Sequence, residues 1–194
     1  TARNIAAGEL TYRAGILLGL ATNVVFLFLV VLLYRLFEQV DRGRAVLMVV
    51  LVSVGVAVAL GNTLNRFAPL VLLDDATYLS EFTRPQLEAL ALSSFRYRGS
   101  ASLFPLCFWG LWLFPFGLLV MKSRFLPRIL GVLIVAAGVA YCVTSVGSLL
   151  WPEYRGAINR YMTPFFFGEV PIIFWLLIKG VRERPLAPAQ LPLG

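Results

Sequence analysis

The chain has 194 residues, of which 59% are hydrophobic and only 14% are charged. A soluble globular domain carries about 25% charged residues, so this composition excludes an ordinary soluble protein and predicts one that lies in lipid. The 17 Lys and Arg against 10 Asp and Glu are typical of cytoplasmic loops of membrane proteins, and no basic, aromatic-rich soluble region is present, so no nucleic-acid partner is expected.

The apolar runs predict helices rather than strands. Backbone groups in lipid must be paired within the protein, which leaves helices and closed barrels as spanning structures. The runs are far longer than the roughly 10-residue strands of a barrel. We therefore predict an all-α, polytopic transmembrane helix bundle with five spans, forming one domain over residues 1–184. The proline-rich tail at 185–194 is expected to be disordered.

The first two predicted spans cover residues 12–36 and 45–66. Each carries small residues at intervals of four, which place them on one helix face. Such a face lets a neighbouring helix approach closely in a membrane. The stripes comprise Gly15, Gly19 and Asn23 in the first span and Ser53, Ala57, Gly61 and Asn65 in the second.

A long polar connection follows the second span and contains a predicted amphipathic helix at residues 83–98. Thr83 is the expected N-cap, with Gln86 reaching back to it. Leu87 and Ala91 then share one face of this helix. Two alternatives fit the pattern: a helix lying at the membrane interface, or the extramembrane beginning of the next span.

The last three predicted spans cover residues 102–121, 126–151 and 161–181. Pro115 and Pro171 lie within the third and fifth of the five spans, where each removes one backbone hydrogen bond and is expected to kink the helix. A further small stripe lies in the fourth span. It comprises Ala136, Ala140, Thr144 and Ser148.

Basic residues predict the orientation of the bundle. The seven-residue link KSRFLPR at 122–128 contains no acid, and short basic links remain on the cytoplasmic side. The C-terminus is then cytoplasmic and the start of this chain extracytoplasmic, in the cytoplasmic (inner) membrane of a bacterium. A six-span protein with both ends inside would need one more helix before Thr1, and the opening TARNIAAGELTYR is typical of a connection.

The residues that usually perform enzyme chemistry are scarce. The sequence has no histidine, and its two cysteines, Cys107 and Cys142, fall inside apolar segments as expected for core residues. No second intramembrane acid is available for paired-carboxylate chemistry. We predict no metal site and no catalytic residues, and hence no enzyme.

One ionisable residue, Glu169, is predicted to lie within a span. A carboxylate in the bilayer usually faces the bundle and has a partner. Polar residues of the other spans fall at similar depths, so we predict one polar cluster that opens outward. It either holds the helices together by hydrogen bonds or forms a ligand or ion pocket. Its candidate members are Glu169, Arg66, Asn62, Asn65, Tyr141, Thr144, Ser145, Ser148 and Asn23.

Aromatic residues are concentrated in the third and fifth spans. We predict that they form outer faces that contact membrane lipids, other membrane subunits or a bound lipid or pigment. No other cofactor is expected. These residues are Phe104, Phe108, Trp109, Trp112, Phe165, Phe166, Phe167, Phe174 and Trp175.

Several stretches are similar to a known family. They are Tyr12, Arg13 and Gly15; Leu32 to Phe37 and Val40 to Gly43; Gln86 to Leu92; Phe125 to Tyr141; and Gly168 to Val181. Over nearly its whole length the chain resembles the small bacterial six-helix membrane proteins called domain of unknown function 4386. The resemblance implies a further helix before the start of this chain and supplies a fold rather than an activity. Family members commonly carry histidines around the third span and an acid near residue 144, whereas this chain has no histidine and has Thr144.

The function predicted from these observations is a non-catalytic accessory or structural subunit of a larger bacterial membrane complex. The alternative is a small solute or ion carrier, or a lipid-binding membrane protein, that uses the polar cluster around Glu169.

Overall fold

The computed structural model describes residues 9–72 and 81–180, and these residues contain helices and no strand. The all-α prediction is confirmed. The helices are α2 (Glu9–Phe37), α3 (Arg42–Leu64), α4 (Ala68–Leu72), α5 (Arg84–Ala101), α6 (Leu103–Lys122), α7 (Arg128–Leu150), η2 (Pro152–Tyr154), α8 (Arg155–Phe166), η3 (Phe167–Glu169) and α9 (Val170–Ile178).

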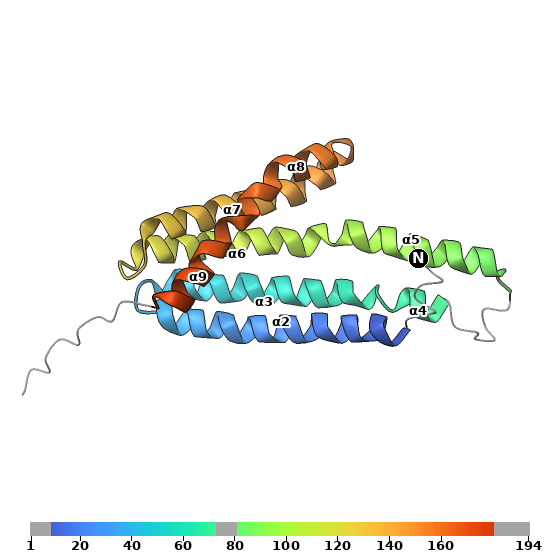
Figure 1. The fold of residues 1–194 in the computed structure, drawn as a ribbon, viewed down its shortest axis with the longest axis horizontal. Helices are drawn as coiled ribbons and strands as arrows, with labels where there is room; N and C mark the ends of the chain where they lie inside the picture. The colour runs from blue at the N-terminus through green and yellow to red at the C-terminus, as the bar shows by residue number, and fades with distance from the viewer. Residues whose placement is uncertain (1–8, 73–80, 181–194) are drawn as a thin grey trace, which may run out of the picture.

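Five helical stretches of the described chain are long and apolar enough to cross a membrane, so the chain is a multi-pass membrane protein. They are Leu10–Phe37, Arg42–Leu64, Pro85–Lys122, Arg128–Leu150 and Pro152–Ile178. Figure 1 shows α2, α3 and the α5–α6 pair running along the long axis, with α7 and α8 inclined to them. The predicted tail at 185–194 lies outside the described residues.

The predicted helix at 83–98 is the beginning of the third span. The backbone N–H of Thr83 donates a hydrogen bond to Oε1 of Gln86 at 2.8 Å, so Gln86 reaches back to the helix start as predicted. Helix α5 then leads into α6, and Figure 1 shows the two almost in line. Leu87 and Ala91 are buried. Of the two alternatives, the structure therefore favours a helix that begins a span.

The fifth span begins earlier than residue 161. A short turn, η2, follows α7 and α8 begins at Arg155. Together α8, η3 and α9 form what we call the C-terminal limb, which lies alongside α7 and then runs diagonally across the bundle in Figure 1. It is the least buried of the five spans: 6% of its apolar stretch is buried within the structure, against 50% for Pro85–Lys122.

Glycines bring α6 and α7 into backbone contact. A Cβ atom added to Gly138 would lie 2.9 Å from the carbonyl oxygen of Gly110, and one added to Gly117 would lie 2.7 Å from that of Gly131. Real Cβ contacts are not this short, so these positions require glycine. Gly110 faces Gly138, and Gly117 faces Gly131, so two glycine contacts hold the hairpin together. On each helix the two glycines are seven residues apart.

The stripes of small residues in the first two spans were predicted to pack against a neighbouring helix. Among the described residues they do not. The Arg66 side chain lies over the glycine face of α2, because its Nη1 lies 3.4 Å from where a Cβ of Gly19 would be. On α3, Ser53, Ala57 and Gly61 are exposed. The buried face of α3 instead consists of the larger residues Ala45, Met48, Val52 and Val56.

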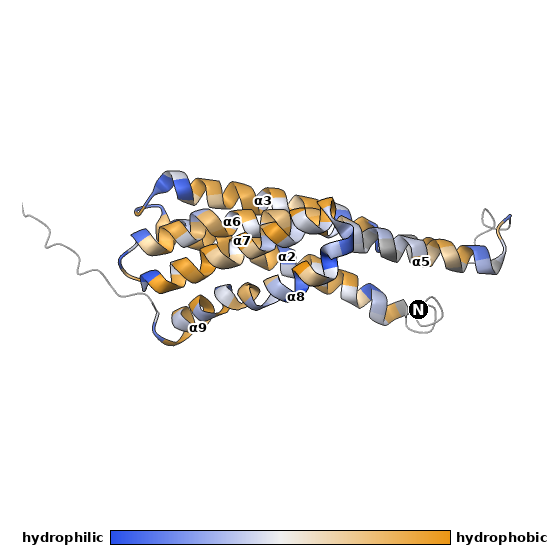
Figure 2. Ribbon diagram, turned by 90° about the horizontal axis from the view of Figure 1, so that it is seen from above, coloured by the Kyte–Doolittle hydropathy of each residue, from blue (hydrophilic) through white to orange (hydrophobic). Residues whose placement is uncertain are grey.

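Two loops meet at one end of the bundle. Asp41 caps α3 by accepting the backbone N–H of Arg44 at 3.1 Å, and its carboxylate accepts the Lys122 ammonium at 3.0 Å. Because Asp41 precedes α3 and Lys122 ends α6, the two basic links predicted to share one side do lie together. Figure 2 shows these hydrophilic loops at one end and hydrophobic residues through the middle of the helices.

Replacing Asp41 with asparagine is expected to lower the thermal stability at neutral pH. The Arg44 N–H and the Lys122 ammonium hold the pKa of the Asp41 carboxyl below its ordinary value of 3.8. The stabilising contribution is therefore present above pH 3.8 and is lost as the pH falls through the lower folded-state pKa. Melting curves of both proteins at pH 7 and about pH 2 check this; an equal difference at both pH values would contradict it.

Aromatic side chains form a continuous array inside the bundle. Phe26 of α2 stacks on Trp109 with centroids 4.6 Å apart, and Trp112 stacks on Phe116 at 5.2 Å. Phe37, which is fully buried, continues the array from Phe116 to the α6–α7 turn.

The predicted outer faces are therefore only partly external. Trp112 is 5% exposed, whereas Phe104 is 56% and Phe167 is 67% exposed. The prediction that Trp112 lies on an outer face is wrong, because this indole packs against Phe26 of α2 and Phe116 of its own helix.

Candidate functional site

Glu169 lies where the C-terminal limb changes from one helix to the next. The segment Phe167–Glu169 is a 3-10 turn, and α9 begins with Pro171 in its first turn, where the missing N–H is tolerated. Gly168 rests directly on α7, since a Cβ there would collide with the carbonyl oxygen of Leu133. This contact holds the Glu169 side chain against α7.

The partner of Glu169 is Tyr141. The Tyr141 hydroxyl donates a hydrogen bond to Oε1 of Glu169 at 2.8 Å. Phe166 stacks on the Tyr141 ring, with centroids 4.1 Å apart and planes 4° apart. The indole of Trp109 lies beside the pair and interacts with both oxygen-bearing groups. The acid–phenol pair therefore joins the limb, α7 and α6.

Arg66 belongs to a different group. Its Nη1 donates to the carbonyl oxygen of Gly15 at 3.4 Å, and its own carbonyl oxygen accepts the Tyr12 hydroxyl at 3.0 Å. Asn65 donates to Asn62 nearby at 3.3 Å. Within the described residues no hydrogen bond or ion pair joins this group to Glu169, so the structure does not bring Arg66, Asn62 and Asn65 to the acid.

The predicted polar residues of α7 face the helix interfaces. The Ser145 hydroxyl donates to the carbonyl oxygen of Leu103 at 2.7 Å, at the start of α6. Thr144 and Ser148 are each 3% exposed, and their hydroxyls have no hydrogen-bond partner among the described residues. These three residues belong to the interior of the bundle, separate from the Glu169–Tyr141 pair.

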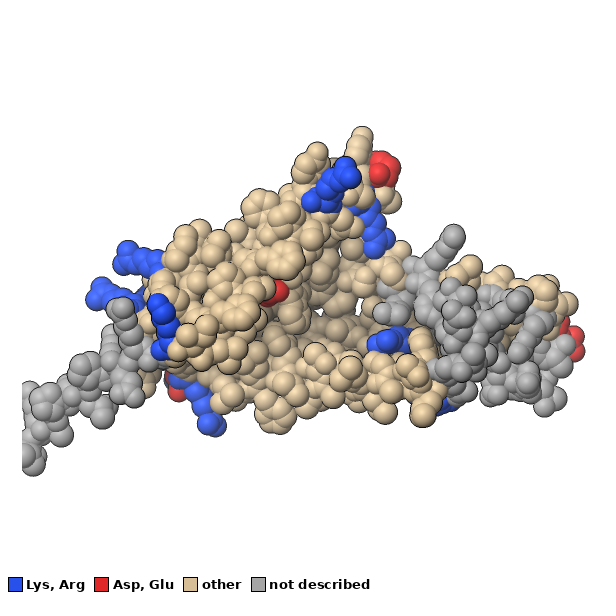
Figure 3. Space-filling model, viewed as in Figure 1, with Lys and Arg blue, Asp and Glu red and all other residues tan. Residues whose placement is uncertain are grey.

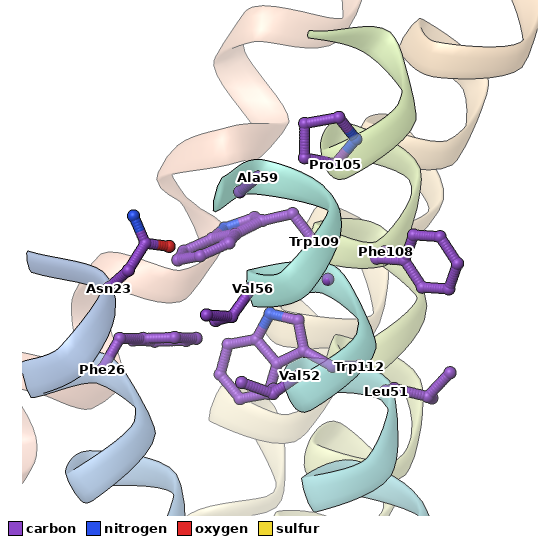
Figure 4. A pocket seen from close by; sticks show the side chains of 11 residues that line it. Asn23, Phe26, Leu51, Val52, Val56, Ala59, Pro105, Phe108, Trp109 and Trp112 are labelled. Atoms are coloured by element: carbon purple, nitrogen blue, oxygen red, sulfur yellow. The ribbon is translucent and has the colours of Figure 1, made fainter. Parts of the chain in front are cut away.

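Asn23 lines a small cavity between α2, α3 and α6 (Figure 4). The cavity has a volume of about 40 Å³. Trp112 and Trp109 form part of its wall, and the Trp112 indole N–H has no partner among the described residues. The complete lining comprises Asn23, Phe26, Leu51, Val52, Gly55, Val56, Ala59, Pro105, Phe108, Trp109 and Trp112.

The site therefore includes residues that the sequence analysis did not assign to it. Trp109 and Phe166 complete the surroundings of the acid, and Phe26 and Trp112 line the cavity. A signal for two of them was present: Phe26 follows Asn23 by three residues, and Trp112 follows Trp109 by three. Residues at this spacing share a helix face. The pairing of those faces depends on how α2 and α6 pack.

The chemistry available at the site is hydrogen bonding and proton binding. Within the described residues, no group of three or more His, Cys, Asp or Glu side chains is placed to hold a metal ion. Cys107 and Cys142 are free thiols on facing helices, and the Cys142 S–H points to the Cys107 carbonyl oxygen at 3.9 Å. The carboxyl, phenol and indole groups suit a polar partner group, a cation or a proton.

Replacing Tyr141 with phenylalanine is expected to destabilise the fold by about 0.6 kcal/mol, the average for a hydrogen bond between membrane helices. The ring stack on Phe166 is retained in this variant. Equilibrium unfolding in detergent measures the change. In a Glu169→Gln background the same substitution is expected to cost less, since the charge-assisted bond is already lost; equal costs in both backgrounds would contradict the pairing.

One of the comparisons with known proteins identifies a family. A family model described as "Domain of unknown function (DUF4386)" matches residues 1–180. An uncharacterised protein of Archaeoglobus fulgidus is 42% identical to the chain over 73 residues, which are 38% of this chain and 42% of that protein. The chain thus matches less than half the length of this relative. No solved structure matches.

Proposed function

The chain belongs to the DUF4386 family and has five helices able to cross a membrane, and from that premise we propose that it is a non-catalytic accessory subunit of a larger complex in the cytoplasmic membrane. The observation that carries the proposal is the C-terminal limb, which is little buried, is apolar along α9 and carries Glu169 near its centre. Lipid tails cover apolar side chains, but they offer nothing to a carboxyl group.

The polar side of the limb favours a protein partner. Glu169 is only partly buried, and it accepts a hydrogen bond from Tyr141. Figure 3 shows a hollow between the upper part of the molecule, where α8 lies, and the helices below it. A helix of another subunit that carries a donor group would fit against this surface and would also cover Phe174 and Leu177, which are 58% and 77% exposed.

Site-specific photo-crosslinking tests the role. A photoreactive phenylalanine at Phe174 is expected to capture a membrane protein of defined mass in native membranes. The matched control is the same group at Val25 of α2, which is 66% exposed and equally apolar. Protein adducts that form at position 174 but not at position 25 support a subunit interface on the limb. Lipid adducts alone at both positions would show that the limb faces the bilayer.

The proposed orientation places the Asp41–Lys122 end in the cytoplasm. It is supported by the density of basic residues in the 122–128 link and by the ion pair between the two links. Single cysteines in the link are expected to resist a membrane-impermeant maleimide in intact cells. Labelling from outside would reverse the orientation.

A second candidate function is a small solute or ion carrier, or a lipid-binding protein. It is favoured by the Glu169–Tyr141 pair, which shares Trp109 with the cavity lining. Arg66 contributes to neither the pair nor the lining. Reconstituted protein that transports a solute, with transport lost in Glu169→Gln and retained in Arg66→Gln, would support this function over the accessory role.

An enzymatic role has less support. Within the described residues, Ser94, Ser102, Ser123, Ser145 and Cys142 donate their side-chain hydrogen bonds to backbone carbonyl oxygens rather than to a base. We therefore keep a non-catalytic role as the proposal.

A further inference from the structure

We infer that the cavity between α2, α3 and α6 is a binding site for a small neutral molecule that accepts and donates hydrogen bonds, with water as the smallest member of that class. The site lies inside the membrane-spanning part of the chain. This inference is independent of the accessory role, because it concerns the bundle interior rather than the limb surface.

The first observation is the indole of Trp112. This side chain is 95% buried, since only 5% of it is exposed, and its N–H has no hydrogen-bond partner among the described residues. Figure 4 shows the indole nitrogen directed into the space below Trp109. A buried donor without a partner lowers stability, because it has lost its hydrogen bonds to water. A ligand oxygen in the cavity would accept this hydrogen bond and remove that cost.

The second observation is that Asn23 offers the cavity a hydrogen-bond acceptor, whereas Trp112 offers a donor. Its amide nitrogen donates to the carbonyl oxygen of Gly19 at 2.8 Å, which leaves the amide oxygen as an acceptor. Figure 4 shows this oxygen pointing toward Trp109, across the same space. The cavity therefore presents a donor from α6 and an acceptor from α2, as a molecule that both accepts and donates requires.

The size of the cavity sets the size of the ligand. A water molecule needs a cavity of roughly 10–15 Å³, whereas this cavity has a volume of about 40 Å³. The cavity is therefore large enough for water and too small for more than a few water-sized molecules. An acyl chain would contact the apolar walls formed by Val56 and Phe26, but would leave the Trp112 N–H and the Asn23 oxygen without partners. Cavities with polar groups on two sides are the ones that hold water, whereas apolar ones remain dry.

One side chain of the cavity lining, Trp109, also lies beside Glu169. Trp109 lines the cavity, stacks on Phe26, and interacts with Glu169 and Tyr141. A ligand that shifts the Trp109 ring is therefore expected to change the surroundings of the Glu169–Tyr141 pair as well. Trp109 is thus the side chain that the cavity shares with the surroundings of Glu169.

Nuclear magnetic resonance of the indole N–H groups tests the inference. The chain has four tryptophans, so protein labelled with ¹⁵N at tryptophan in lipid nanodiscs gives four indole signals, assigned by single Trp→Phe variants. We expect the Trp112 indole to show a magnetisation-transfer cross-peak to water. Trp151, which is 53% exposed, serves as the positive reference.

Matched variants distinguish a bound ligand from general exchange. Ala59→Leu places a larger side chain in the cavity wall and is expected to abolish the water cross-peak of Trp112. The control is Ala57→Leu on the same helix, where the side chain is exposed and the cross-peak should persist. Should Ala59→Leu fail to fold, Asn23→Leu, which removes the acceptor, is expected to reduce the cross-peak.

Two outcomes would overturn the inference. One is a Trp112 indole that shows cross-peaks to lipid methylene protons and none to water, which would mean an acyl chain occupies the cavity. The other is a water cross-peak that is unchanged in both Ala59→Leu and Asn23→Leu.

Discussion

Replacing Gly168 with alanine is expected to separate the C-terminal limb from α7. The new Cβ would collide with the carbonyl oxygen of Leu133 and lie 3.1 Å from its carbon. Both atoms belong to the backbone of a long helix, so neither can turn away as a flexible side chain would. We expect a cost on the order of 3 kcal/mol, the upper end of the usual range for overpacking.

The loss should be visible both in stability and in the position of the limb. Equilibrium unfolding measures the first, and electron spin resonance distances between labels on α7 and α9, in a background lacking native cysteines, measure the second. The matched control is Gly156→Ala in α8, where a new Cβ meets no atom within 4 Å. If both variants behave like the parent, Gly168 does not rest on α7 as described.

Replacing Gly138 with alanine is expected to weaken the α6–α7 hairpin. Its Cβ would lie 2.9 Å from the carbonyl oxygen of Gly110 and 3.2 Å from Cβ of Leu113. Relief requires the two helices to move apart, which loosens the neighbouring contact between Gly117 and Gly131. We expect a destabilisation of about 1–3 kcal/mol, measured by unfolding in detergent.

The control for this hairpin variant is Gly61→Ala on α3, where no atom lies within 4 Å of the new Cβ. That substitution is expected to be neutral or slightly stabilising, since alanine favours a helix more than glycine does. An equal loss in both variants would mean that glycine is needed for helix flexibility rather than for close packing.

Part of the candidate site was predictable from the sequence. Glu169 was identified because a carboxyl group within an apolar run is costly and therefore needs a partner. Tyr141 was among the residues expected near it, and the structure joins the two. Arg66 was expected there as well, because depth along a span was the only guide. The structure instead places its guanidinium over the glycine face of α2.

Depth alone does not decide which side chains meet, since it leaves the rotation of each helix undetermined. Trp112 and the stripe of Ser53, Ala57 and Gly61 illustrate this. Trp112 was expected outside and is buried, and the stripe was expected inside and is exposed. In water, polar residues mark the outer face of a helix, but a membrane span is apolar on all sides, so its pattern does not show which face is buried.

The sequence by itself determined the helical class, the five spans, the shared end of the two basic links and the family. These follow from the length of apolar runs and the position of charges, which lipid constrains strongly. Only the tertiary structure decided that glycines of α6 and α7 meet, that Glu169 pairs with Tyr141, and that Trp112 and Asn23 face one cavity. Those contacts depend on close packing between faces of equal hydropathy, and shape rather than polarity selects among them.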